Sequence, residues 1–253
     1  MNKMKTLITL SFLCFFTVNL FAQGTKPVPK KTTTQKAPVK KTTTTKTKAP
    51  VKKETKIPGT RVKITTDSGV IVIRLYDSTP RHRDNFIKLA NEHYFDSLLF
   101  HRVMYQFMIQ GGDPNSKNAQ PGQMLGAGDI GYTIPSEFNP AFYHKKGALA
   151  AARTPDHVNP EKASSSCQFY IVQGRTWTDI DLNNIDNQRP VKYTPEQRNA
   201  YKTIGGYPPL DMNYTVFGEV ESGLQVVDKI ASVRTAPGDR PIGDIRMKIE
   251  VIK

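Results

Sequence analysis

The chain has 253 residues, of which 38% are hydrophobic, and a formal net charge of +14 at pH 7. This length is enough for one large domain or two small ones. The positive charge is concentrated near the N-terminus: Lys3 and Lys5 contribute +2 and residues 26–56 contribute +10, which leaves +2 for residues 57–253. A nearly neutral body argues against a nucleic-acid-binding domain, which would carry its basic charge on the folded surface.

Residues 1–22 have the organisation of a secretory signal. A short basic start precedes an apolar run, and the segment ends on the small residue Ala22. The apolar run is shorter than the roughly 20 residues that a membrane-spanning helix needs. A lipid anchor at Cys14 is a weaker interpretation, because the preceding Leu13 is bulky. We expect an exported protein located in the periplasm, with extracellular and envelope-associated locations as alternatives.

Residues 23–57 form a Lys/Thr/Pro-rich linker with a loose internal repeat. The linker has no aromatic residue and cannot bury enough apolar surface to offset the entropy of ordering a chain. We therefore expect a disordered, partly extended tether. Two roles are open for it: electrostatic contact with anionic components of the cell envelope, and a solvated spacer, which charge runs commonly are.

Short alternating segments follow the linker. Residues 62–66 and 70–76 flank a turn signal at residues 67–69 and predict a β-hairpin. Thr79-Pro80 then offers a cap and a proline for the first turn of a helix, and a second helix is expected at residues 223–232. Many short strands with two helices fit a closed antiparallel barrel capped at its ends.

Residues 100–113 read FHRVMYQFMIQGGD and combine a permanently charged guanidinium, a neutral amide and apolar side chains, without a nucleophile. If the two halves of this run are strands, alternation with period two places Arg102 on one face with Phe100, and Phe107 with Ile109. Such a surface can hold an extended peptide and polarise one of its amides, but it cannot attack a bond.

This run resembles the active-site strand pair of the cyclophilins, the peptidyl-prolyl cis-trans isomerases. Further blocks stand in the family's order at residues 62–76, 131–138, 166–171 and 210–218. The resemblance implies a mainly β domain at residues 58–253, built as a closed eight-stranded antiparallel β-barrel capped by two helices, behind the disordered tail.

The resemblance also implies an activity, the isomerisation of X-Pro bonds, with proline-containing polypeptides as partners and no cofactor. It assigns catalysis to Arg102 and Gln110. It assigns substrate binding to Phe107, Met108, Ala152, Arg153, Gln168, Tyr170, Leu210 and Tyr214. Among these, Arg153, Tyr170 and Tyr214 depart from the asparagine, phenylalanine and histidine that many relatives have.

Residues 178–209 form an insert at a place where members of the family commonly have almost no residues. A strong helix start at Thr194-Pro195 predicts a short helix to about Thr203. The insert joins the strand of Tyr170 to the loop of Leu210, so it should lie beside the expected peptide-binding groove. Contact with substrate and decoration of the barrel rim are both open roles.

Other kinds of site fit the sequence poorly. The five histidines lack the paired spacing of zinc ligands. Residues 179–183 resemble the start of a calcium loop without its glycine and glutamate, so we expect turn residues there. Cys167 has no basic neighbour and is expected to be a small, semi-buried residue at the start of a strand. We expect a monomer, and two rival functions stay open: a non-catalytic peptide-binding or chaperone module, and a structural envelope component.

Overall fold

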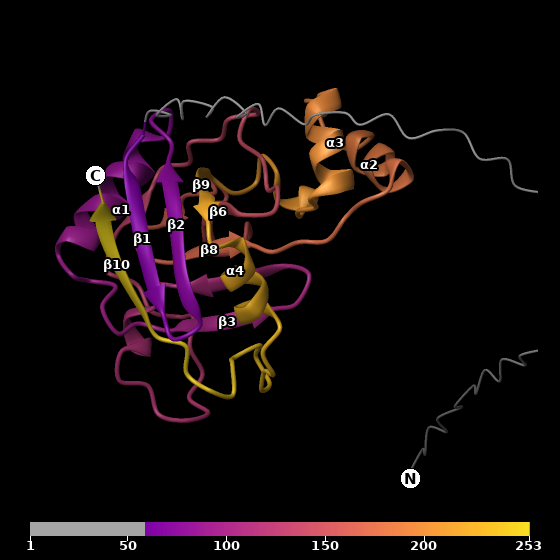
Figure 1. Ribbon diagram of the computed structural model, residues 1–253. Helices are drawn as coiled ribbons and strands as arrows, with labels where there is room; N and C mark the ends of the chain where they lie inside the picture. The colour runs from indigo at the N-terminus through magenta and orange to yellow at the C-terminus, as the bar shows by residue number, and fades with distance from the viewer. Residues whose placement is uncertain (1–58, 253) are drawn as a thin grey trace, which may run out of the picture. The chain divides into compact units, whose positions relative to one another are not determined.

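The computed structural model of the protein describes residues 59–252 (Figure 1). Its strands are β1 Arg61–Thr66, β2 Gly69–Leu75, β3 Phe100–Met104, β4 Met108–Gly111, β5 Thr133–Ile134, β6 Ala148–Ala151, β7 Ser164–Ser165, β8 Phe169–Val172, β9 Val216–Ser222 and β10 Met247–Ile252. Its helices are α1 Pro80–Asn91, α2 Asp179–Asp186, α3 Pro195–Thr203 and α4 Leu224–Ala231, with 3-10 turns η1 Pro114–Ser116 and η2 Pro208–Leu210. None of these helices has the length and apolar character needed to cross a membrane. The predicted signal and linker lie outside the described residues.

Eight strands form one sheet in the order β10-β1-β2-β9-β6-β8-β4-β3, and β5 pairs with β7 in a second, small sheet. The predicted mainly β fold is confirmed, but the prediction of a closed barrel is wrong, because the curled sheet has β10 and β3 as its edges. Near these edges the chain makes only a few backbone hydrogen bonds, such as Ser97 to Met247 and Phe100 to Ile245. This contact lies at the first residues of β3 and β10, and from there the two strands run in opposite directions.

The predicted opening hairpin and first helix are present. β1 pairs with β2 so that Thr66 stands opposite Gly69, which leaves a two-residue turn. Pro80 begins α1 as predicted, since its fixed φ suits the first turn. Thr79 does not cap the helix as predicted, because its hydroxyl donates to an upstream carbonyl. The Glu137 carboxylate instead accepts from two free N–H groups of the first turn.

The two predicted helices cover the sheet. α1 packs against β9 and β10, and α4 packs against β2, β3 and β4. Both helices bury apolar residues in one cluster with the sheet. Within this cluster the ring of Phe169 meets three other rings nearly at right angles, those of Phe86, Phe95 and Phe100. The core therefore lies between the inner face of the curled sheet and its two covering helices.

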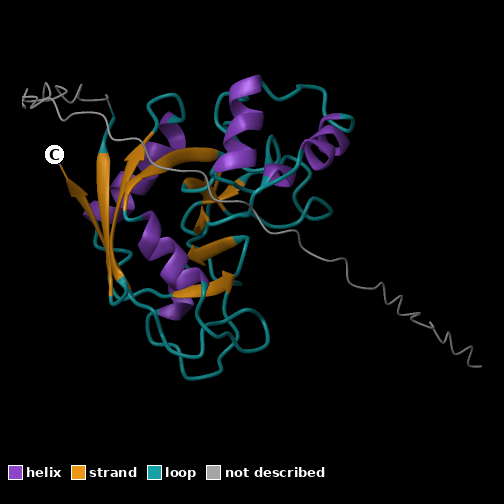
Figure 2. Cartoon of the chain, turned by 45° about the vertical axis from the view of Figure 1, so that its right-hand side comes forward, coloured by secondary structure: helices purple, strands orange, loops and turns teal. Residues whose placement is uncertain are grey.

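The insert at residues 178–209 carries two helices, which lie side by side and away from β10 in both views (Figures 1 and 2). α3 is the helix predicted between Pro195 and Thr203. The expectation of turn residues at 179–183 is wrong, because these residues begin α2. Thr178 and Asp181 form a capping box that satisfies two N–H groups at the start of α2.

Replacement of Ile73 by alanine should destabilise the fold strongly. Ile73 is fully buried in β2, and deleting an isoleucine side chain from a packed core costs about 2–5 kcal/mol of unfolding free energy. Ile242 is the matched control: it is 63% exposed, so the same substitution should cost less than about 0.5 kcal/mol. Urea denaturation measures both, and equal losses would contradict the described core.

Candidate active site

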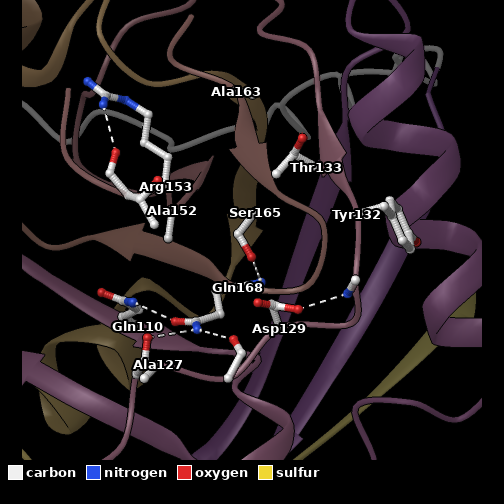
Figure 3. A pocket seen from close by; sticks show the side chains of 14 residues that line it. Gln110, Ala127, Asp129, Tyr132, Thr133, Ala152, Arg153, Ala163, Ser165 and Gln168 are labelled. Carbon is white, nitrogen blue, oxygen red and sulfur yellow. Dashed lines mark hydrogen bonds between the residues drawn. The ribbon is translucent and has the colours of Figure 1, made fainter. Parts of the chain in front are cut away.

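Strands β6, β8, β4 and β3 are neighbours in the sheet, and two adjoining hollows lie over them. The first hollow, of about 420 Å³, is lined by His101, Arg102, Phe107, Met108, Gln110, Leu125, Gly126, Ala127, Ala152, Arg153, Tyr170, Leu210 and Tyr214. The second hollow, of about 520 Å³, shares Gln110, Ala152 and Arg153 with the first and is also lined by Gln168 (Figure 3). Nine of the ten predicted site residues thus border the first hollow, and Gln168 borders its neighbour.

A register shift in β3 decides which side chains face the first hollow. Phe100 pairs with Gly111 and Arg102 pairs with Gln110, so His101 is an extra residue on the β3 side. The expectation that Phe100 and Arg102 share a face is wrong, because this bulge interrupts the alternation. Phe100 lies in the apolar core, whereas Arg102 borders the hollow.

The turn before β4 separates a second expected pair. Phe107 lies in that turn, one residue before β4 begins, and packs with the apolar residues around the first hollow. Ile109 is inside β4 and belongs to the core on the other face. Phe107 and Ile109 therefore do not share a face as expected, because the alternation starts only at Met108.

Arg102 is held loosely at the first hollow. Its Nε donates to the Asp239 carboxylate at 3.3 Å, its Nη1 to the Gln110 side-chain oxygen at 3.5 Å and its Nη2 to the Met104 sulfur at 3.0 Å. A guanidinium has five N–H donors and stays charged at any working pH. With 40% of the side chain exposed, Arg102 can present the remaining N–H groups to a bound molecule.

Two glutamine amides form a fixed bridge between the hollows. Gln110 Nε2 donates to Gln168 Oε1 at 3.0 Å, and Gln168 Nε2 donates to the carbonyls of Gly126 at 3.0 Å and Gly128 at 2.7 Å (Figure 3). Gln168 therefore orients Gln110 and the loop at residues 126–128. Its own contact with a substrate stays a prediction.

Aromatic rings line the rest of the first hollow. The Phe107 ring packs against Tyr207 with 4.2 Å between centroids and 36° between the ring planes, and Tyr170 meets Tyr214 edge-on at 6.0 Å. Burial raises the pKa of Tyr170 well above its usual value, and its hydroxyl lies 2.9 Å from Nε2 of His144. The Tyr170 hydroxyl, which the phenylalanine of many relatives lacks, is thus hydrogen-bonded to His144, and the Tyr170 ring borders the first hollow.

Ala152 and Arg153 contribute different groups. The N–H of Ala152 donates to the Gln168 carbonyl and its C=O accepts from Ser165. The backbone N–H and C=O of Arg153 have no hydrogen-bond partner among the described residues. The Arg153 side chain lies over the Tyr214 ring at 4.4 Å and points away from the glutamine bridge in Figure 3. Arg153 can therefore offer its backbone to an extended peptide.

Residues 61–251, which include every residue of both hollows, match the family model described as cyclophilin type peptidyl-prolyl cis-trans isomerase/CLD. The chain belongs to the cyclophilin family. A Staphylococcus saprophyticus protein named as a peptidyl-prolyl cis-trans isomerase is 31% identical over 204 residues, which cover 79% of this chain and 96% of that protein.

Other relatives of this cyclophilin are larger or more distant. A Streptococcus pyogenes protein named as a bifunctional phosphatase/peptidyl-prolyl cis-trans isomerase is 36% identical over 190 residues, covering 74% of this chain but only 37% of that relative. The crystal structure of a Cryptosporidium parvum cyclophilin-type isomerase, determined in the presence of the dipeptide Ala-Pro, has a TM-score of 0.54 and 21% identity. It covers 76% of this chain and 99% of its own, and it shows the shared fold.

Several residues of the site are absent from the sequence-based set, and two of them, His101 and Asp239, adjoin Arg102. His101, the bulge residue, is buried and borders the first hollow, and its position beside Arg102 in the motif could have indicated it. Asp239 reaches Arg102 from 137 positions later in the chain, so no local pattern could have found it.

Cys167 borders neither hollow. It is more deeply buried than the semi-buried position expected, and burial raises the pKa of its thiol. Within residues 59–252, no three His, Cys, Asp or Glu side chains gather as metal ligands would.

His101 should make the fold sensitive to acid. Burial lowers the pKa of His101 from 6.5 to about 4, so between these values the unfolded chain binds a proton that the folded protein does not. The free energy of unfolding therefore falls as the pH falls through this window. The full pKa shift of His101 corresponds to a loss of unfolding free energy on the order of 3 kcal/mol.

Urea denaturation of wild type and His101→Leu at pH 7 and pH 4 measures this effect. His101→Leu should lose less stability than wild type on acidification, whatever its stability at pH 7. His157→Leu is the control, because His157 is exposed and its removal should leave the wild-type pH dependence. Equal acid sensitivity of wild type and His101→Leu would contradict the assignment.

Proposed function

We propose that this cyclophilin isomerises X-Pro bonds of exported proteins and that Arg102 stabilises the twisted amide. The observation that carries the role of Arg102 is its position: a guanidinium with N–H groups to spare borders the first hollow, together with the Gln110 amide and the apolar ring of Phe107. The first hollow is then the proline pocket.

The reaction needs a donor and no nucleophile. Rotation of an X-Pro bond removes amide resonance against a barrier of roughly 18–20 kcal/mol. In the twisted state the proline nitrogen regains a lone pair that the planar amide lacks. A donor aimed at that lone pair binds the transition state better than either planar isomer, which is what catalysis requires. Arg102 is a charged donor at the border of the pocket, whereas the Arg153 guanidinium donates to the Asn213 carbonyl and the Asp156 carboxylate.

The apolar wall supplies a second effect. A planar amide is more charge-separated than a twisted one, so removing water raises the energy of the ground state more than that of the transition state. A charge-assisted hydrogen bond contributes about 1.5–3 kcal/mol, and each 1.36 kcal/mol changes a rate about tenfold. Arg102 therefore accounts for about two orders of magnitude, and the pocket and substrate positioning supply the rest.

An extended polypeptide fits the arrangement of the two hollows. With proline in the first hollow, the chain can pair with the free backbone groups of Arg153 and place a neighbouring side chain in the second hollow, across the Gln110–Gln168 bridge (Figure 3). The Ala-Pro dipeptide used with the Cryptosporidium parvum relative supports a proline-containing ligand.

Substitution of Arg102 by alanine should lower kcat/KM for an X-Pro peptide by about two orders of magnitude. Arg102→Lys keeps the charge but not the fork of donors, so its activity should lie between those of alanine and wild type. Arg81→Ala is the control, because Arg81 is exposed on α1 and should leave activity unchanged. Exchange NMR on the peptide measures all three. A wild-type protein that binds the peptide without accelerating isomerisation would identify a non-catalytic peptide-binding module instead.

Export can be tested on the mature chain. The signal at residues 1–22 supports cleavage after Ala22, so mass spectrometry of the protein from envelope or culture-medium fractions should give a chain that begins at Gln23. A chain retained in the cytoplasm with its first 22 residues intact would contradict export. If the basic linker binds anionic envelope components, deletion of residues 26–56 should reduce envelope retention, and equal retention would identify a spacer.

A further inference from the structure

One buried carboxylate connects the proline pocket to the insert. Asp211 follows the pocket residue Leu210 directly, and only 2% of its side chain is exposed. We propose that Asp211 is a positioning residue through which the insert holds the shape of the proline pocket and sets its affinity. The inference rests on the proposed function, since it takes the first hollow as the proline pocket.

Four hydrogen-bond donors converge on Asp211. Oδ1 accepts from Nδ1 of His144 and from the backbone N–H of the same residue, both at 2.7 Å. Oδ2 accepts from the hydroxyls of Tyr193 at 2.8 Å and Tyr201 at 2.5 Å. The Arg189 guanidinium lies 3.6 Å from Oδ2. A carboxylate has about four acceptor sites, so Asp211 is saturated and held from both sides.

His144 carries this constraint to one wall of the pocket. Because a carboxylate only accepts, Nδ1 must hold a ring proton. Nε2, on the other side of the ring, lies 2.9 Å from the Tyr170 hydroxyl and forms a hydrogen bond with it. The two rings are buried and nearly parallel, with 15° between their planes. A displacement of Asp211 would therefore move the Tyr170 ring that borders the pocket.

The backbone carries the same constraint to a second wall. The N–H of Asp211 donates to the Pro208 carbonyl at 3.1 Å and closes the turn that contains Leu210. The N–H of Tyr214 donates to the Leu210 carbonyl at 3.2 Å. Leu210 and Tyr214 both border the pocket, so their positions depend on the turn that the Asp211 carboxylate anchors.

The insert supplies two of the four donors. Tyr193 precedes α3 and Tyr201 lies within it, and their rings pack against each other at 5.3 Å. With Leu182 of α2 they form an apolar cluster separate from the core of the sheet. Asp211 is thus a polar link between that cluster and the pocket. The insert supports the pocket from behind, which differs from both substrate contact and decoration of the rim.

The test removes single polar groups and measures peptide binding separately from catalysis. Tyr201→Phe keeps the ring in its cluster and removes one donor to Asp211. Asp211→Asn keeps the size of the side chain and removes acceptor sites. Tyr143→Phe is the matched control, because its ring meets Tyr201 edge-on at 5.4 Å while its hydroxyl has no hydrogen-bond partner in the part of the chain that the structure describes. NMR titration with an X-Pro tetrapeptide gives Kd, exchange NMR at saturation gives the rate, and urea denaturation verifies folding.

Tyr201→Phe and Asp211→Asn should each raise Kd roughly three- to tenfold, a part of the loss expected for one hydrogen bond to a charged group. The rate at saturation should stay within about twofold, because both substitutions leave Arg102 and the apolar side chains of the pocket in place and change only how well the pocket fits the bound peptide. The Kd of the double variant should rise by less than the product of the two single increases, since both substitutions act through one carboxylate. Tyr143→Phe should bind as wild type.

Three results would overturn the proposal. The first is a Kd within about twofold of wild type in both single variants, and the second is an increase in Kd of the double variant equal to the product of the two single increases. The third is a loss of affinity in Tyr143→Phe as large as in Tyr201→Phe. If Asp211→Asn does not fold, the pair Tyr193→Phe and Tyr201→Phe provides the comparison on Oδ2, and Tyr193→Phe also removes the hydrogen bond to the Pro208 carbonyl. A wild type that binds the peptide without accelerating its exchange would refute the proposed function, and Kd would still decide the role of Asp211. A wild type that binds no peptide would overturn both.

Discussion

The extra residue at His101 in β3 is the constraint on which the groove depends. Regular alternation would place Arg102 on the face of Phe100, inside the apolar core, where an unpaired guanidinium costs several kcal/mol. The bulge keeps Phe100 inside and leaves Arg102 beside Gln110 at the first hollow. Burial holds the pKa of His101 near 4, so at neutral pH Arg102 is the positive charge of the bulge.

The polar groups of the groove divide into fixed and available ones. The Gln168 amide and the Ala152 backbone are hydrogen-bonded within the protein and hold their neighbours in place. Arg102 keeps N–H groups without a described acceptor, and the Arg153 backbone has no hydrogen-bond partner within residues 59–252. A donor already satisfied by the protein would have to break that bond before meeting a substrate. Available donors on a fixed frame can instead bind the transition state more strongly than the ground state.

Local patterns predicted the hairpin, α1, α3 and α4, and the resemblance of short motifs predicted ten side chains that the fold brings to two adjoining hollows. Three features that the sequence did not predict depend on residues far apart in the chain. Glu137 caps α1 from 55 positions away, Asp239 reaches Arg102 from 137, and barrel closure depends on where β10 runs relative to β3. α2 differs, because its capping signature is local. There Asp181 caps a helix that Leu182 anchors in the insert.

The insert and Asp211 are best understood as one unit. A buried carboxylate is costly unless its oxygens are saturated and its charge is compensated. His144 satisfies one oxygen of Asp211, while the insert satisfies the other through Tyr193 and Tyr201 and places Arg189 nearby. The insert thus both covers this oxygen beside the proline pocket and supplies the donors that its burial requires. An insertion distant from Arg102 in sequence can thereby become part of the pocket's support without touching a substrate.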